Sequence, residues 1–303
     1  KKYKLLKIMK TRVKSSRHFY RPTFEFQRGG PYIKGSAAHI PDLSLSIARP
    51  SIQLQQAQQS IILPNTSRSI KTQKTTRRKL PNTLDMFTIG DACGTLSYED
   101  TQYLNLSSRK LNNIDIDSFK MLKSIIEFDV SDNSLPLEPF TFLRTLEILD
   151  FSCNNLSNFS NDKIPDKSTI FPSLKRLNMN YNSIGQIFHY FSAFPNLTQL
   201  TATNNNLTYL PKNTSQFMAL EYLDLTSNSI NSEESFSLLA NFPNLKTLIL
   251  DNNNIEYIPK LQYGFEKLST ISLKNNRIEA SNDIISLTDL ENLRKIDITN
   301  NPI

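Results

Sequence analysis

The chain has 303 residues, of which 35 are lysine or arginine and 28 are aspartate or glutamate, and these charges are unevenly distributed. Residues 1–90 carry 18 basic against 3 acidic residues, a net charge of +15, whereas residues 91–303 carry 17 against 25, a net of −8. No apolar run approaches the roughly 20 residues of a transmembrane helix, and two cysteines, Cys93 and Cys153, are too few for a disulfide framework. The composition therefore predicts a basic arm and an acidic body, no membrane span, and a reducing compartment.

Residues 1–90 are predicted to form an extended arm of low complexity. They show neither an internal repeat nor a sustained hydrophobic period, and six prolines interrupt them, at positions 22, 31, 41, 50, 64 and 81. Such a stretch buries too little apolar surface to fold alone. Its positive charge is concentrated in Lys1–Arg17 and Lys71–Lys79, and five aromatic residues lie between Phe19 and Tyr32.

The clustered positive charge predicts that the arm lies along a large anionic assembly, and the microtubule and nucleic acid are the two richest surfaces of that kind. The aromatic residues are expected to fill pockets on that partner. The predicted arm anchors are Arg17, Phe19, Tyr20, Arg21, Phe24, Phe26, Tyr32, Lys71, Lys74, Arg77, Arg78 and Lys79. The opening sequence KKYKLLKIMKTRVK also fits a basic amphipathic helix that binds calmodulin or a membrane surface.

From residue 101 onward the frame L-x-x-L-x-L-x-x-N-x-L occurs nine times. The asparagines stand at positions 133, 154, 182, 205, 228, 253, 276 and 301, with spacings of 21 to 28 residues, while the first copy has Arg109 at that place. The L-x-L alternation predicts a short strand with its apolar side turned inward. The asparagine amide is expected to bind backbone groups where the chain bends, in its own repeat and the next.

A second periodic feature lies three residues before the first leucine of the frame. Phenylalanine occupies this position five times, at residues 171, 194, 217, 242 and 265, and leucine occupies it at 122, 143 and 290. Aromatic residues at a fixed period predict a stacked core on the convex side of the repeats, in preference to a ligand site.

The polar residues between the apolar frame positions are expected to point outward from the strands. This concave face is where repeat proteins of this kind bind their partners. Its predicted contacts lean acidic and include tyrosines, which are favoured in protein interfaces: Tyr103, Glu127, Asp129, Asp132, Asp150, Arg176, Tyr181, Tyr222, Asp224, Asp251 and Lys274. They indicate a groove for a basic or helical segment, which the chain's own arm could also occupy, although solvated strand residues would give a similar pattern.

The frame over residues 100–303 resembles the leucine-rich-repeat superfamily. The stretches DVSDNSLPLEPF (129–140), NLTYLPKN (206–213) and LEYLDLTSNSINSEESFSLLANFPNLKTLILDNNNIEYIPKLQ (220–262) are similar to the X-ray radiation resistance-associated leucine-rich-repeat proteins. The resemblance implies an α/β solenoid, a horseshoe with parallel strands on its concave face. It also implies a non-catalytic scaffold of a type frequent in cilia and flagella. The predicted organisation is an arm over residues 1–90 and a repeat domain over 91–303 that continues beyond Ile303.

The residues that carry enzyme chemistry are not in suitable patterns. The segment from Gly30 to Gly35 has the spacing of a phosphate-binding loop, but Lys34 precedes the second glycine and no lysine follows it. His18, His39 and His189 are isolated from one another and lack metal-ligand spacing with the cysteines. We therefore predict no enzyme activity, no catalytic residues, no bound metal and no cofactor.

These observations favour a scaffold of a large cytoskeletal assembly, with tubulin or axonemal proteins as candidate partners. The expected location is the cytoplasm and cytoskeleton, in the axoneme of a cilium or flagellum. Two alternatives remain open. In the first, the arm binds RNA and the repeats recruit proteins to a ribonucleoprotein; in the second, the repeats act as a regulatory adaptor of a phosphatase or dynein.

Overall fold

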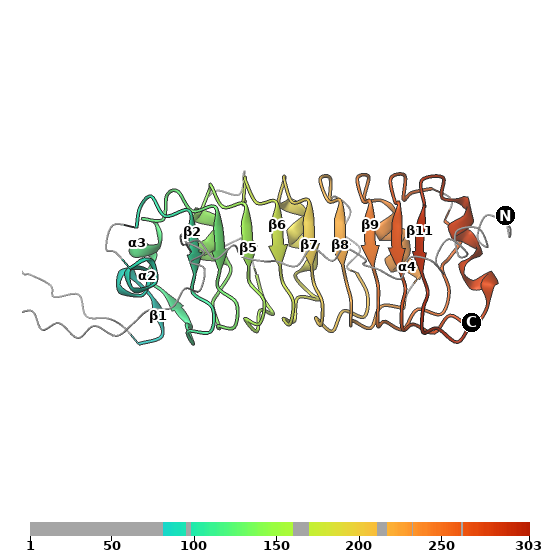
Figure 1. The fold of residues 1–303 in the computed structure, drawn as a ribbon, viewed down its shortest axis with the longest axis horizontal. Coiled ribbons are helices and arrows are strands. Elements are labelled where there is room, and N and C mark those ends of the chain that lie inside the picture. Colours follow the sequence, from blue (N-terminus) through green and yellow to red (C-terminus); the bar gives the residue numbers. More distant parts are fainter. Residues whose placement is uncertain (1–80, 95–97, 160–169, 211–216, 232, 262) are drawn as a thin grey trace, which may run out of the picture. The chain divides into compact units, whose positions relative to one another are not determined.

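The computed structural model describes residues 81–94, 98–159, 170–210, 217–231, 233–261 and 263–303. Residues 1–80 lie outside these ranges, and with them all the predicted arm anchors. The described residues form a stack of repeats in which each turn of the chain contributes one strand (Figure 1). The predicted repeat architecture is confirmed.

The described strands of the stack form one parallel sheet whose spatial order follows the sequence. Each three-residue strand pairs in register with the strand of the next repeat, so equivalent frame positions lie side by side, as Tyr103, Glu127 and Ile148 do. In chain order the strands are β2 (Tyr103–Asn105), β4 (Glu127–Asp129), β5 (Ile148–Asp150), β6 (Arg176–Asn178), β7 (Gln199–Thr201), β8 (Tyr222–Asp224), β9 (Thr247–Ile249), β10 (Thr270–Ser272) and β11 (Lys295–Asp297).

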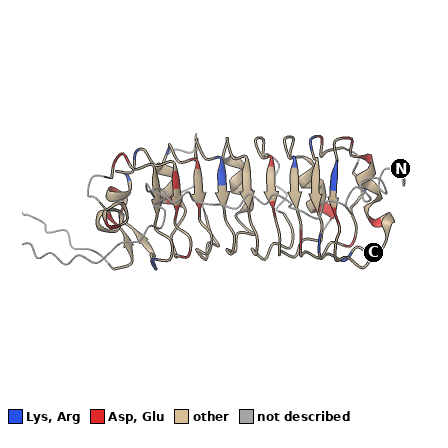
Figure 2. Cartoon of the chain, in the orientation of Figure 1, with Lys and Arg blue, Asp and Glu red and all other residues tan. Residues whose placement is uncertain are grey.

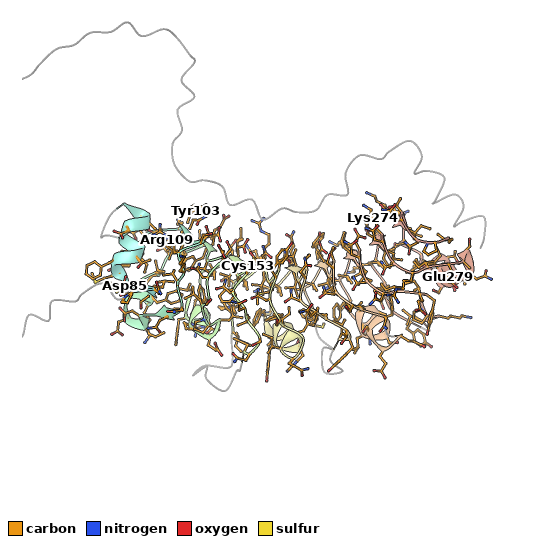
Figure 3. The ribbon with its side chains drawn as sticks, turned by 90° about the horizontal axis from the view of Figure 1, so that it is seen from below. Asp85, Tyr103, Arg109, Cys153, Lys274 and Glu279 are labelled. Carbon is orange, nitrogen blue, oxygen red and sulfur yellow. The ribbon has the colours of Figure 1, made fainter. Side chains whose placement is uncertain are left out.

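The helices that connect the strands lie on one side of this sheet, and the outward strand residues lie on the other (Figures 1 and 3). We call the second side the strand face. The helical connections are α3 (Ile116–Phe119), η1 (Glu138–Phe142), η3 (Phe188–Ala193), α4 (Glu233–Ala240) and η4 (Ser281–Asp289). Apolar residues from both layers meet between them and form a single core cluster along the stack.

The first repeat is covered by a short segment, residues 83–93, most of which the sequence analysis assigned to the arm. Strand β1 (Thr83–Leu84) pairs with β3 (Asn113–Ile114), and helix α2 (Met86–Cys93) lies against β2. Asp85 begins α2 by accepting a 2.9 Å hydrogen bond from the Thr88 amide, and Gly94 ends it with φ +69°. The folded part therefore begins before residue 91. This segment was missed because it does not follow the repeat frame.

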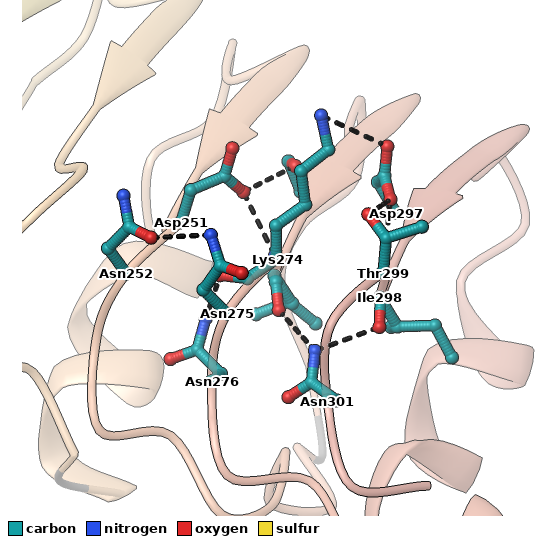
Figure 4. A network of polar contacts seen from close by, with 11 residues as sticks. Asp251, Asn252, Lys274, Asn275, Asn276, Asp297, Ile298, Thr299 and Asn301 are labelled. Carbon is teal, nitrogen blue, oxygen red and sulfur yellow. Dashed lines mark hydrogen bonds and ion pairs between the residues drawn. The ribbon is translucent and has the colours of Figure 1, made fainter. Parts of the chain in front are cut away.

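The repeated asparagines make the backbone contacts that the sequence predicts. The Asn182 amide nitrogen donates to the carbonyls of Phe151 and Met179, at 3.0 and 3.1 Å. Its side-chain oxygen accepts from the amides of Asn154 and Leu156, at 3.1 and 2.8 Å. Asn301 repeats the donor half of the pattern with the carbonyls of Leu273 and Ile298 (Figure 4). Each asparagine thus joins two repeats.

The residue before each repeated asparagine, and before Arg109 in the first repeat, has a left-handed backbone. Its φ lies between 52° and 60° in all nine repeats. Asparagine occupies the position four times, and asparagine tolerates this conformation better than most residues. Cys153 and Tyr181 adopt it in the third and fourth repeats, where the turn geometry of the stack overrides their local preference. The full set is Ser108, Asp132, Cys153, Tyr181, Asn204, Ser227, Asn252, Asn275 and Asn300.

The phenylalanines of the convex side form the stacked core that the sequence predicts. Phe171 and Phe194 have ring centroids 4.9 Å apart, and Phe217 and Phe242 lie 5.0 Å apart. Phe188, from η3, contacts Phe217 at 5.6 Å. All of these rings are almost fully buried. They link adjacent repeats on the side opposite the strand face.

Replacing Gly264 by alanine is expected to destabilise the fold by at least about 2 kcal/mol, because two costs combine. Gly264 has φ +111°, and an added Cβ would lie 2.5 Å from the carbonyl oxygen of Ala240 at the end of α4. That carbonyl also accepts a 2.8 Å hydrogen bond from the Phe265 amide, so it cannot withdraw without breaking this bond. Chemical denaturation measures the loss. Gly185→Ala is the control, since its Cβ would meet only Leu207, at 3.8 Å; equal effects of the two changes would contradict the prediction.

Candidate functional site

The strand face is the candidate functional surface, because it holds every predicted contact of the repeat domain. Its residues occupy the two outward positions of each strand and the turn that follows. Tyr103 and Lys274 project from it on the side opposite the helices (Figure 3). The structure gives these contacts very different exposures.

Three predicted contact aspartates, Asp129, Asp150 and Asp224, are buried within the strand face. One oxygen of each accepts from the backbone amide and hydroxyl of the residue two places later: Ser131, Ser152 and Thr226. The prediction that they are exposed is wrong. A D-x-S/T sequence at the end of a strand forms a local turn, and the closely spaced neighbouring strands cover the carboxylate.

Two of these carboxylates are also bound by an asparagine of a neighbouring repeat. Asn178 donates to the second oxygen of Asp150 at 2.8 Å, and Asn105 donates to that of Asp129 at 2.9 Å. Burial raises the pKa of Asp150, and the charge of Asp129 raises it further, against the lowering effect of the hydrogen bonds from Ser152 and Asn178. The position of Asp150 is therefore unfavourable for its charged form.

The last repeats contain a connected polar group (Figure 4). Asp251, another predicted contact, is buried and accepts from the Lys274 amide at 3.0 Å and from the Ser272 hydroxyl. The Lys274 ammonium is 3.3 Å from a carboxylate oxygen of Asp297. Lys274 is half-buried, and the nearby Asp297 carboxylate balances its charge within the chain. This end of the strand face carries paired charges.

The predicted tyrosines divide into two classes. Tyr103 and Tyr181 are 52% and 59% exposed, whereas Tyr222 is 8% exposed between its strand neighbours. The expected outward exposure of Tyr222 is therefore wrong. Tyr103 lies on β2, near the N-terminal end of the stack, and Tyr181 lies in the turn after β6. The two exposed rings flank the strands that carry Glu127 and Asp150.

The charged residues between these tyrosines are mostly acidic. Glu127 and Arg176 are half-buried, and their nearest charged atoms are 3.9 Å apart, which leaves only a weak ion pair. Asp132 is exposed and accepts a 2.8 Å hydrogen bond from the Ser108 hydroxyl. Asn105 and Cys153 are also exposed here, although the sequence analysis did not select them. The sequence could have identified them, because Asn105 occupies the same frame position as Asp129 and Cys153 the same position as Asp132.

Replacing Asp132 by asparagine is expected to accelerate alkylation of Cys153 about two- to threefold, as loss of one nearby charge in a largely aqueous setting implies. Desolvation raises the pKa of the Cys153 thiol, and the charges of Asp132 and Asp150 raise it further. Removing one negative charge lowers the pKa of the thiol. At any pH below that pKa, the fraction of reactive thiolate therefore increases. Mass spectrometry after iodoacetamide treatment measures the rate, with Cys93 in the same sample as the control. An unchanged Cys153 rate would show that Asp132 does not act on the thiol.

Comparison with solved structures supports the architecture. An internalin C2 from Listeria monocytogenes superposes with a TM-score of 0.56 and 22% identity, over 71% of this chain and 92% of that chain. A TLR13 complex with single-stranded RNA has the same TM-score at 29% identity, over 65% of this chain and 28% of that chain. The chain is a leucine-rich-repeat protein.

Two curated relatives match the leucine-rich-repeat protein over 45% of its length. X-ray radiation resistance-associated protein 1 of Mus musculus is 27% identical over 156 residues, and leucine-rich repeats and immunoglobulin-like domains protein 1 of Homo sapiens is 29% identical over 167 residues. The match spans 19% of the first relative and 15% of the second. No family model matches the chain.

Within the ranges given above, no helix combines the length and apolar character needed to span a bilayer. The same residues contain no group of three or more histidine, cysteine, aspartate or glutamate side chains arranged to hold a metal ion.

Proposed function

We propose that this leucine-rich-repeat protein is a non-catalytic scaffold that docks another protein on its strand face. The observation that carries the proposal is the pair of exposed tyrosines, Tyr103 and Tyr181, beside half-buried charged residues on a broad sheet surface. Tyrosine is enriched at protein interfaces because it combines a large apolar area with a polar end. Helices η1, η3 and α4 occupy the opposite side and α2 covers the N-terminal end, so the sheet surface between the ends is left to a partner (Figures 1 and 3).

We further propose that the scaffold belongs to a large cytoskeletal assembly, with the ciliary or flagellar axoneme as the favoured setting. Residues 1–90 carry a net charge of +15, which suits attachment to an anionic polymer such as the microtubule. The repeats would then hold a second protein at the site of attachment. The similarity to X-ray radiation resistance-associated protein 1 agrees with a scaffold role and does not select the assembly.

RNA association is the second candidate. One structural neighbour is a complex with single-stranded RNA, and the basic residues 1–90 would suit phosphate contacts. The strand face argues against RNA on the repeats themselves, because its N-terminal half carries Glu127, Asp129, Asp132 and Asp150, and acidic colour marks β4 there (Figure 2). An RNA would have to bind the basic region while the repeats recruit protein.

The setting is tested by fractionating the native protein with demembranated axonemes. Retention through a high-salt wash is expected for a built-in structural component. Nuclease-treated soluble extract is analysed in parallel, since release by nuclease together with a steep loss of RNA affinity in salt would indicate the RNA alternative. Absence from washed axonemes would contradict the axonemal proposal and leave the docking role to be tested separately.

A further inference from the structure

Charge is not spread evenly along the strand face. In the first three repeats, the outward strand positions and the outward turn positions that precede the repeated asparagine, or Arg109 in the first repeat, contain four carboxylates and no cation among the described residues. The same positions of the last three repeats contain two carboxylates and two cations. In Figure 2, acidic colour marks β4, and basic colour first appears on the strands at β6. We call the following set the N-terminal patch: Tyr103, Glu127, Asp129, Asp132, Asp150, Cys153, Arg176 and Tyr181.

The negative charge of the N-terminal patch is only partly balanced. Arg176 is its one cation, and its separation of 3.9 Å from Glu127 makes a weak contact. Arg109 and Lys110 are exposed in the turn after β2, at the edge of the patch. Burial is the main cause that raises the pKa values of Asp150 and Cys153, and the charges of neighbouring carboxylates raise both further.

The carboxylates of the patch have two different roles. Asp129 and Asp150 are buried, and both oxygens of each accept hydrogen bonds within the chain, so they contribute charge beneath the surface. Glu127 and Asp132 are more accessible and can be contacted directly. The exposed rings of Tyr103 and Tyr181 add surfaces over which a guanidinium group can stack.

The dimensions of the patch suit an extended chain. Strands β2, β4, β5 and β6 are successive neighbours, so three steps of about 4.8 Å separate the first from the last. An extended segment advances about 3.3 Å per residue, so about five residues cross this distance. Alternate side chains of such a segment face the same side, which brings two or three of them onto the patch.

We propose that the N-terminal patch binds an extended protein segment with arginine at alternate positions, crossing strands β2 to β6. This rests on the proposed docking function and specifies the partner's chemistry and its place on the face. Arginine fits best because its planar group pairs with carboxylates and stacks on tyrosine rings. The chain as a whole carries a formal charge of +7, so general attraction would not recruit a basic segment.

The full chain is titrated with a fluorescent peptide of sequence Ala-Arg-Ala-Arg-Ala-Arg-Ala, and anisotropy reports binding. A peptide with glutamate in place of arginine is the comparison. We expect saturable one-to-one binding of the arginine peptide, weakened by salt, together with protection of Cys153 from alkylation while Cys93 is unchanged. The combined change Glu127→Gln and Asp132→Asn is expected to weaken binding about tenfold or more, as loss of two charged contacts implies.

A matched variant, Glu256→Gln with Glu279→Gln, removes the same charge from exposed positions of the C-terminal repeats and is expected to change affinity less than about twofold. Equal weakening by both variants, absence of binding, or binding without protection of Cys153 would overturn the inference. If Cys153 is alkylated slowly in the absence of peptide and faster when salt is added, a basic stretch of this chain already occupies the patch. That result would overturn the inference of a separate partner. Docking of a native partner that does not depend on Glu127 or Asp132 would leave the proposed function standing while this inference fails.

Discussion

Replacing Asn228 by leucine is expected to lower the free energy of unfolding by at least about 3 kcal/mol. The Asn228 side chain is buried and makes hydrogen bonds of 3.0 Å or less to four backbone groups. Its oxygen accepts from the amides of Asn205 and Leu207, both at 3.0 Å, and its nitrogen donates to the carbonyls of Ala202 and Leu225, both at 2.9 Å. Leucine is of similar size and can satisfy none of these groups.

The matched control for this change is Asn254→Leu. Asn254 is half-exposed, and its frame position holds lysine, serine or arginine in other repeats, so we expect a change within about 0.5 kcal/mol. Guanidinium denaturation followed by circular dichroism compares the two variants with the unchanged chain. A loss below about 1 kcal/mol for Asn228→Leu would mean that solvent or a rearranged turn satisfies the four groups.

Replacing Phe242 by alanine is expected to cost about 3–5 kcal/mol, the range found for large core truncations. The ring is fully buried and lies 5.0 Å from Phe217, which in turn contacts Phe188. Its loss opens a cavity between two repeats and removes an aromatic contact that links them. Since each repeat in such a stack is stabilised mainly by its neighbours, unfolding is expected to become less cooperative.

The control for the aromatic change is Phe142→Ala. Phe142 is exposed on η1, and its main described contact is with the Lys120 ammonium, 5.4 Å from the ring centroid. Loss of this contact is expected to cost no more than about 1 kcal/mol. Both variants are followed by thermal unfolding monitored by circular dichroism. Similar midpoints for Phe242→Ala and Phe142→Ala would show that the aromatic stack does not hold the repeats together.

The fold was predictable because its determinants recur at a fixed period. A single leucine or asparagine says little, but Asn182 and Asn228 stand at the same place in the frame and make the same backbone contacts. The frame therefore indicated both the strands and the ladder between them. The segment containing α2 escaped prediction because a cap that covers one edge has no counterpart in the other repeats.

The candidate site was less predictable, because an outward frame position does not determine exposure. Asp224 points outward, yet neighbouring strands and its own turn bury it, whereas Asp132 remains exposed only a few residues after the equivalent Asp129. The serine or threonine two residues after the aspartate was the local signal for an internal role. Tyr222 is buried and Tyr103 is exposed, and this difference depends on the side chains that the adjacent strands place beside each ring. Those neighbours are known only once the register of the sheet is known.

Docking on the strand face is tested most directly by placing a photo-crosslinking benzoylphenylalanine at position 103 or 181 in the native cell. Both positions hold exposed aromatic residues, so the change preserves size and character. Position 142 on η1 serves as the matched control on the opposite side. The scaffold account predicts that positions 103 and 181 form a covalent adduct with the same protein and that position 142 does not. Adducts confined to position 142, or none at 103 and 181 while the native complex persists, would contradict it.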